Sequence, residues 1–148
     1  MKSWILFAAL ALPLGTAPAL AQTRADVVAA LEANFGAPER FEEAFAVIQA
    51  AIGEDDATTL SEFIPLGSPL MVEGEEVVFD DAEAFIERYD ALITPQIRDV
   101  VANQSFDTLF VNAEGVMFGA GEVWMTGICL DDSCADFEVK IITLQSGL

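Results

Sequence analysis

The chain has 148 residues, of which 6 are Lys or Arg and 25 are Asp or Glu, and it contains no histidine. The missing histidine excludes Ser-His-Asp and Cys-His catalysis and the histidine-rich zinc sites. A net charge of −19 argues against nucleic acid and anionic lipid as partners, because both need basic patches. Neither acidic cluster, GEDD at 53–56 or EGEE at 73–76, fits the spacing of a calcium loop, so we expect no metal and no cofactor.

The first 21 residues have the features of a secretory signal peptide. Lys2 gives a basic start, an apolar run follows from Trp4 to Leu14, and Ala19-Leu20-Ala21 is a small-residue cleavage site. The apolar run is too short to span a bilayer, and an uncleaved membrane anchor is the alternative. We therefore expect a periplasmic or secreted protein whose mature chain, residues 22–148, is a single domain with no membrane segment.

Helix signals dominate the first part of the mature chain. Apolar residues recur at helical spacing, and each run is bounded by a capping residue, a proline or a glycine. We predict helices between Thr23 and Gly36, from Pro38 to Gly53, and from Asp55 or Asp56 to Pro65. Two more are predicted further on, one capped by Asp80 and carrying Phe85, Ile86 and Tyr89, and one beginning at Thr94-Pro95.

Strand signals occupy most of the remaining chain. PLMVEGEEVVFD, residues 69–80, is typical of a hairpin that turns at Gly74. The runs TLFVN and GVMFG, followed by longer strands over 122–130 and 137–144, predict a four-strand meander. Helices, a hairpin, helices and a meander form an α+β order. We expect one curved antiparallel sheet wrapped around the helices.

Cys129 and Cys134 are the only cysteines, and an exported chain places them in an oxidising compartment. A lone pair at this spacing is too sparse for zinc and too wide for a thioredoxin-like motif, which favours a disulfide across the mouth of a hairpin. If the two cysteines face each other, then Trp124 faces Val139. Because side chains alternate between faces, Trp124 and Glu122 are predicted on the apolar, core-side face.

The same register assigns Val123, Met125 and Lys140 to the outer face of the sheet. Glu122 then lies beside Trp124, where desolvation raises the pKa of a carboxyl and makes it a candidate acid, base or ligand anchor. Two alternatives for Glu122 are that it reaches solvent at the pocket rim, and that a bulge at a nearby glycine moves it. For Trp124, the alternative is packing in the core rather than against a ligand.

Two further polar side chains are candidates for the same pocket. Tyr89 follows Phe85 by four residues on one predicted helix face, so it points inward, either as core or as a hydrogen-bond donor. Arg98 lies near a helix start, where the dipole slightly disfavours a cation. Asp90 and Glu122 are its candidate partners, and pairing at the surface is the alternative.

Several stretches resemble the nuclear transport factor 2-like superfamily, in particular small secreted bacterial members. The likeness lies in FIPLGSPLMVEGEEVVFDDAEAFIERYDALITPQIRDVV and LFVNAEGVMFGAGEVWMTGIC, and is carried by Phe85, Tyr89, Pro95, Arg98, Gly115, Gly119, Glu122 and Trp124. The resemblance implies a cone, with a curved sheet around a pocket closed by helices. Some members of the superfamily are isomerases, dehydratases or cyclases with polar side chains inside the pocket, whereas others bind or dimerise through the sheet without catalysis.

Three functional hypotheses follow. The first is a non-catalytic pocket protein that binds a small ligand or a protein partner, with Trp124, Glu122, Tyr89 and Arg98 as binding residues. The second is an isomerase, dehydratase or cyclase that uses Glu122 as base and Tyr89 as donor. The third is an interaction module that dimerises, or binds another protein, through the apolar residues assigned to the outer sheet face.

Overall fold

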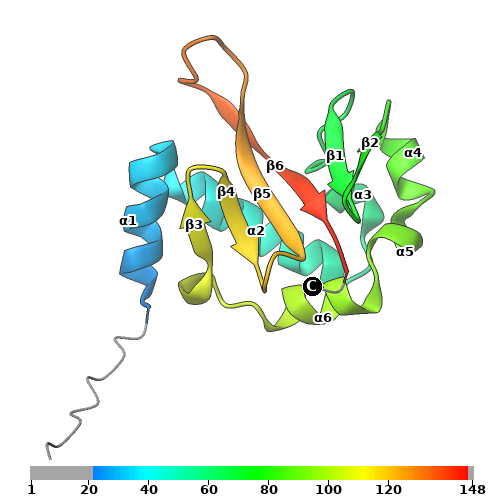
Figure 1. Ribbon diagram of the computed structural model, residues 1–148, viewed down its shortest axis with the longest axis horizontal. Coiled ribbons are helices and arrows are strands. Elements are labelled where there is room, and N and C mark those ends of the chain that lie inside the picture. The colour runs from blue at the N-terminus through cyan, green and yellow to red at the C-terminus, as the bar shows by residue number, and fades with distance from the viewer. Residues whose placement is uncertain (1–21, 147–148) are drawn as a thin grey trace, which may run out of the picture.

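A computed structural model describes residues 22–146, so the predicted signal peptide lies outside the described residues (Figure 1). The helices are α1 (Arg24–Phe35), α2 (Pro38–Gly53), α3 (Ala57–Ser61), α4 (Ala82–Ile86), α5 (Tyr89–Leu92) and α6 (Pro95–Asn103), with a 3-10 turn η1 (Phe106–Thr108). The strands are β1 (Pro69–Val72), β2 (Glu75–Val78), β3 (Phe110–Asn112), β4 (Gly115–Phe118), β5 (Val123–Cys129) and β6 (Phe137–Leu144). The predicted α+β class is confirmed. No helix within residues 22–146 is long and apolar enough to cross a membrane.

Most predicted helix boundaries are confirmed, because the capping groups lie where the sequence places them. The Thr23 hydroxyl accepts the N–H of Asp26, and the Asp26 carboxylate accepts the N–H of Thr23 in return. Gly36 ends α1 in the left-handed region, with a φ of 76°. The Thr94 hydroxyl accepts the N–H of Ile97 and so begins α6.

The helix predicted after Asp80 is instead two short helices. Asp81 caps α4, and its carboxylate accepts the N–H of Ala84 at 2.9 Å. The N–H of Arg88 donates to the carbonyl of Phe85, three residues back, which is the hydrogen-bond pattern of a 3-10 turn. This turn separates α4 from α5.

The six strands form one sheet in the order β2-β1-β6-β5-β4-β3. The hairpin and the meander are antiparallel as predicted, but β1 runs parallel to β6, so the sheet is mixed rather than wholly antiparallel. The two parallel strands are far apart in the sequence, and no local pattern signals their pairing. They meet only at residues 143–144 of β6, and Figure 1 shows the β5–β6 hairpin extending away from β1.

The predicted register between β5 and β6 is wrong. Val139 pairs with Gly127 instead of Trp124, a shift of three residues. Because three is odd, the shift exchanges the two faces of β5. Val123 and Met125 are therefore fully buried against the helices, and Trp124 is on the outer face of the sheet.

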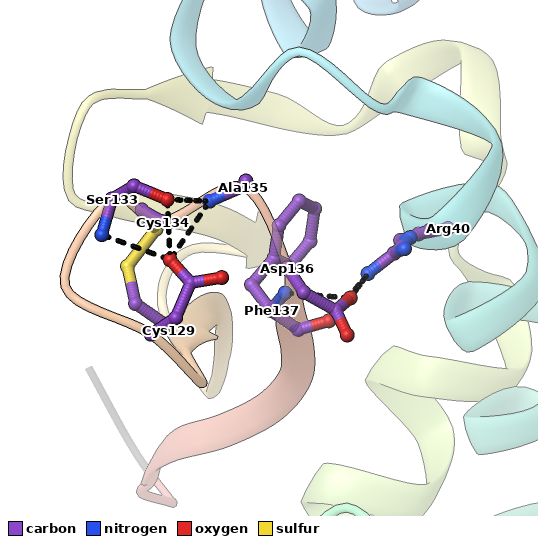
Figure 2. The surroundings of a disulfide bond; sticks show 8 residues. Arg40, Cys129, Ser133, Cys134, Ala135, Asp136 and Phe137 are labelled. Carbon is purple, nitrogen blue, oxygen red and sulfur yellow. Dashed lines mark hydrogen bonds and ion pairs between the residues drawn. A yellow bond between two sulfur atoms is a disulfide. The ribbon is translucent and has the colours of Figure 1, made fainter.

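The hairpin loop explains the error. Cys129 pairs across the ladder with Phe137, not with Cys134. The two cysteines have their Cα atoms 4.8 Å apart and their sulfurs in contact, which is compatible with the predicted disulfide (Figure 2). Cys134, however, lies in a tight turn with a φ of 53°, where its N–H donates to the carbonyl of Asp131. The disulfide thus closes the loop and does not set the strand pairing.

One apolar core lies between the inner face of the sheet and the helices. Helix α2 crosses behind the sheet and buries Phe41, Phe45 and Ile48 there (Figure 1). The Phe45 ring stacks on Phe118 of β4, with ring centroids 5.4 Å apart. Core side chains therefore occupy the inner face on which Trp124 was expected.

Candidate functional site

Trp124 lies on the outer face of the sheet. Its register partners are Met117 on β4 and Thr143 on β6. Its ring meets Phe110 of β3 edge-on, with centroids 6.4 Å apart. Trp124 is therefore part of a surface row and does not line a core-side pocket.

Glu122 is buried, with an exposed fraction of 6%. Its carboxylate forms a hydrogen bond within the turn between β4 and β5. Its Oε2 atom accepts the N–H of Ala120 at 2.8 Å, and its carbonyl accepts the N–H of Gln145 at 2.9 Å. Gly119, with a φ of 62°, makes room for this arrangement, because a Cβ there would collide with Glu122 and with the side chain of Val100. Glu122 closes the β4–β5 turn and is buried for that reason.

Tyr89 and Arg98 lie together where α5 meets α6. The Arg98 guanidinium lies over the Tyr89 ring at 5.3 Å from its centroid. Arg98 also forms ion pairs with Asp55 and, at 3.6 Å, with Asp90. Of the two partners predicted for Arg98, Asp90 is confirmed, whereas Glu122 makes no ion pair with it.

The Tyr89 hydroxyl is a buried donor without an acceptor. The side chain has an exposed fraction of 4%, and its oxygen has no hydrogen-bond partner within residues 22–146. Burial raises the pKa of this hydroxyl, and the carboxylates of Asp90 and Asp56 raise it further. The phenol therefore stays protonated at neutral pH.

A groove of about 860 Å³ opens elsewhere on the molecule, between α2, the segment 61–68 and β6. Its apolar wall includes Val47, Phe63, Pro65, Leu66 and Ile128. Its charged side chains are Arg40, Glu43, Glu62, Glu138 and Lys140. None of the four predicted site residues lines it. The volume and the mixture of apolar and polar walls are typical of a ligand site.

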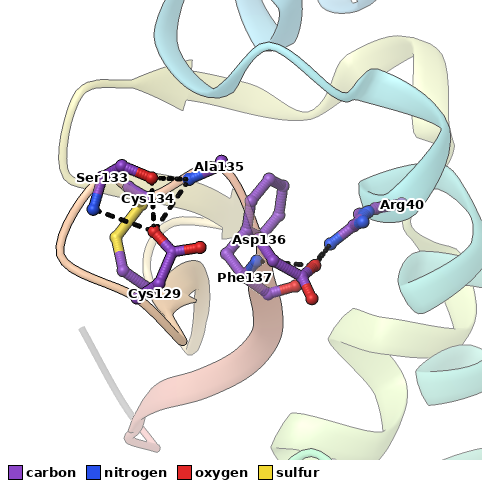
Figure 3. A network of polar contacts seen from close by, with 8 residues as sticks. Arg40, Cys129, Ser133, Cys134, Ala135, Asp136 and Phe137 are labelled. Carbon is purple, nitrogen blue, oxygen red and sulfur yellow. Dashed lines mark hydrogen bonds and ion pairs between the residues drawn. A yellow bond between two sulfur atoms is a disulfide. The ribbon is translucent and has the colours of Figure 1, made fainter.

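Two basic side chains hold the walls of the groove in place. Arg40 of α2 donates to the carboxylate of Asp136 and to the carbonyl of Phe137, both at 2.7 Å, with its guanidinium over the Phe137 ring (Figure 3). Lys140 donates from Nζ to the carbonyl of Glu62 at 2.7 Å. Helix α2 and segment 61–68 are thus both tied to β6.

Sequence reasoning missed the groove because its three walls come from distant parts of the chain. The available signal was the placement of rare positive charge. Only 5 basic residues remain from Gln22 onward, and two of them, Arg40 and Lys140, lie at the groove. Lys140 stands in a mainly apolar strand, where a cation needs a partner.

Within residues 22–146, no group of three or more Cys, Asp or Glu side chains is arranged to hold a metal ion. Comparisons with protein-family models, with curated proteins and with solved structures find no match for this chain. Function is therefore inferred from the groove, the sheet and their residues.

Proposed function

We propose that the protein is a non-catalytic binding protein of the periplasm or extracellular space, with a nuclear transport factor 2-like fold, whose ligand occupies the groove beside β6. The observation that carries the proposal is the groove itself, with its apolar wall, its charged side chains and its volume of about 860 Å³. The signal-peptide pattern of residues 1–21 supports export. The order of helices, hairpin, helices and meander supports the superfamily assignment.

The alternative is a small isomerase, dehydratase or cyclase with Glu122 as base and Tyr89 as donor. That chemistry needs both groups within reach of one point in a pocket. The Glu122 carboxylate instead accepts a hydrogen bond inside the β4–β5 turn, and the Tyr89 phenol is buried beside Phe85 and Arg98. Neither residue lines the groove, so binding without turnover fits the geometry better.

An NMR screen of the ¹⁵N-labelled protein with a library of small amphipathic fragments tests this proposal. We expect bound fragments to shift the amide signals of residues 61–64, 66 and 138–140. Val47→Arg should abolish these shifts, because it places a long charged side chain in the groove. Val78→Arg is the matched control, since Val78 is 52% exposed on β2 and does not line the groove. Shifts confined to Tyr89 and Arg98, or no shifts at all, would contradict the proposal.

The outer face of the sheet favours self-association as a second candidate function. Consecutive register pairs join Phe110, Met117, Trp124, Thr143 and Met71 into one row across β3, β4, β5, β6 and β1. All of these side chains are at least partly exposed, and Phe110 has an exposed fraction of 49%. An apolar row of this kind suits a second copy of the chain.

This interface differs from the one predicted from the sequence. Val123 and Met125 were assigned to the outer face, but both are fully buried, so the row led by Phe110 and Trp124 replaces them. Sedimentation velocity tests the idea: the unaltered protein should be a dimer, and Phe110→Glu should make it monomeric, whereas Ala46→Glu, at an exposed position of α2, should not. A strictly monomeric unaltered protein removes this second function.

A further inference from the structure

Strand β6 has a stretch of edge that faces the groove instead of another strand. Strand β1 pairs with β6 only at residues 143–144. Further upstream, the N–H of Ile141 donates to the carbonyl of Phe63 at 2.7 Å, and the carbonyl of Phe137 accepts from Arg40 at 2.7 Å. The main-chain groups of Ile141 and Phe137 therefore point away from β5.

Val139 lies between these two residues and has the same orientation. Main-chain groups two residues apart in a strand point to the same side, so the N–H and C=O of Val139 also point away from β5. The register is regular from Cys129–Phe137 to Met125–Ile141, so no bulge disturbs this alternation. Val139 lines the groove, and within residues 22–146 no main-chain hydrogen bond outside the strand ladder engages its N–H or its C=O.

An unpaired main-chain donor and acceptor at a strand edge are a template for another extended chain. The outermost edges of this sheet are protected against such pairing. Strand β2 carries Glu75 and Glu76, and β3 is only 3 residues long. The edge at Val139 instead lies within the groove, beside the apolar side chains of Phe63 and Leu66.

The charges at the groove favour a basic ligand. Both cations that line it already hold acidic partners. Glu43 and Glu62 also line the groove, and no ion pair within residues 22–146 engages their carboxylates. The strongly negative chain adds to the attraction of a positively charged segment.

We propose that the groove binds an extended peptide segment, which adds to β6 as a strand at Val139. Its alternate side chains are apolar and pack against Phe63 and Leu66, and a Lys or Arg faces Glu43 or Glu62. Val139 supplies one donor and one acceptor for the peptide main chain, and the apolar wall supplies specificity. This inference rests on the proposed function, because it names the ligand class of the same groove.

The test begins with a displayed library of short random peptides, selected against the immobilised protein. Selected sequences should alternate apolar residues and contain a Lys or Arg. The strongest binder is then synthesised with a single N-methyl group at each position in turn. Strand addition predicts that affinity falls at least about tenfold when the methyl group is on the one peptide residue whose N–H donates to the Val139 carbonyl, and changes little at either neighbour, whose N–H points away. A uniform effect along the peptide would overturn the proposal.

Variants of the protein locate the peptide. Val47→Arg should weaken binding at least about tenfold, whereas the matched Val78→Arg should not. Val139→Pro removes the donor that faces the groove but keeps the hydrogen bonds between β6 and β5, because the Val139 N–H does not contribute to them. The amide spectrum of Val139→Pro reports whether this variant folds. If it does not fold, the N-methyl scan and Val47→Arg decide whether the peptide binds at the groove. Equal binding by Val47→Arg and the unaltered protein would overturn the proposal.

Failure of this inference is distinguishable from failure of the proposed function. If fragments bind the groove in the NMR screen but no peptide binds above its scrambled control, the peptide proposal falls and the small-ligand groove stands. If neither fragments nor peptides bind in a way that Val47→Arg blocks, both proposals fall.

Discussion

The burial of the Glu122 carboxylate is explained by its nearest neighbours. The N–H of Ala120 is a turn donor that needs an acceptor, and Oε2 of Glu122 supplies it at 2.8 Å. The space beside the carboxylate exists because residue 119 is a glycine. Glu122 is therefore buried because of its contacts in the β4–β5 turn, and its burial does not depend on the face of β5 on which Trp124 lies.

Glu122→Ala should lower the free energy of unfolding by about 1–2 kcal/mol, because it removes the carboxylate that accepts the partly buried hydrogen bond from the Ala120 N–H. Glu122→Gln should cost less, since its amide oxygen accepts the same hydrogen bond. Urea denaturation of the two variants measures the difference. If both variants lose the same free energy of unfolding, the hydrogen bond to Ala120 is not the means by which Glu122 stabilises the fold.

The buried hydroxyl of Tyr89 forms no hydrogen bond within residues 22–146. Its removal from water therefore lowers the stability of the folded state without compensation. Tyr89→Phe keeps the ring contacts with Phe85 and Arg98, so we expect it to raise the free energy of unfolding by about 1 kcal/mol. Urea denaturation at neutral pH tests this. A loss of stability would mean that the hydroxyl has a partner, such as a buried water.

The same hydroxyl predicts a dependence on pH. Its pKa is raised in the folded protein by burial and by the carboxylates of Asp90 and Asp56, so the folded state holds the phenolic proton more tightly than the unfolded chain does. The resulting stabilisation is present below the unfolded pKa, near 10, and is lost as the pH rises above it. Between pH 9 and 11 the unaltered protein should therefore lose more stability than Tyr89→Phe. Parallel stability curves for the two proteins would contradict this.

At the scale of the elements, the sequence predicts what local chemistry decides. Thr23, Pro38 and Thr94 mark helix starts because capping needs only the next few residues. Strand β6 is predicted with its observed ends, and its core face of Phe137, Val139 and Ile141 is correct. The predicted core face of β5 is wrong, because it depends on the register with β6, which the loop from Leu130 to Asp136 sets.

Contacts between distant segments are what the sequence does not predict. The parallel pairing of β1 with β6 joins residues 71–72 to residues 143–144, and no turn or cap specifies it. The groove arises from that pairing, because β1 leaves the upstream edge of β6 uncovered and α2 and segment 61–68 form the walls. The ion pair between Arg98 and Asp90 was correctly predicted, since α5 and α6 follow each other closely in the sequence.

The disulfide should stabilise the hairpin loop without defining the strand register. Replacing Cys129 and Cys134 with serine should lower the free energy of unfolding by about 2 kcal/mol, the entropic value for closing so short a loop. The ladder should persist, because Val123, Met125 and Ile141 keep their buried face. Urea denaturation measures the free energy of unfolding, and an amide spectrum reports whether the β5–β6 ladder persists. Loss of the β5–β6 ladder in the double variant would show that the disulfide does set the register.

At the scale of the whole molecule, charge repulsion opposes the compact state. The chain carries a net charge of −19, and many acidic side chains have no ion-pair partner within residues 22–146. Screening by salt should therefore raise the melting temperature between low and physiological ionic strength, as the Debye length falls from about 30 to about 8 Å. Sodium chloride is the appropriate salt, since sulfate also strengthens apolar burial. A flat or falling melting temperature would contradict this.

The sheet presents two distinct surfaces for association. The outer row around Trp124 is apolar and suits a second copy of the chain, whereas the groove combines apolar walls with an unpaired strand edge and suits a peptide. The two surfaces are separate, because none of the five residues that define the row lines the groove. Dimerisation and peptide binding are therefore compatible in one molecule.

In the proposed peptide site, the main chain of Val139 is unpaired and faces the groove. Residue-resolved amide hydrogen exchange of the free protein tests it most directly. Glu138 and Lys140 donate toward β5, and Ile141 donates to Phe63, so these three amides should exchange slowly. The Val139 amide between them should exchange at least about tenfold faster. If Val139 is as protected as Lys140, the edge of β6 is already covered, and the account of the groove as a peptide site is wrong.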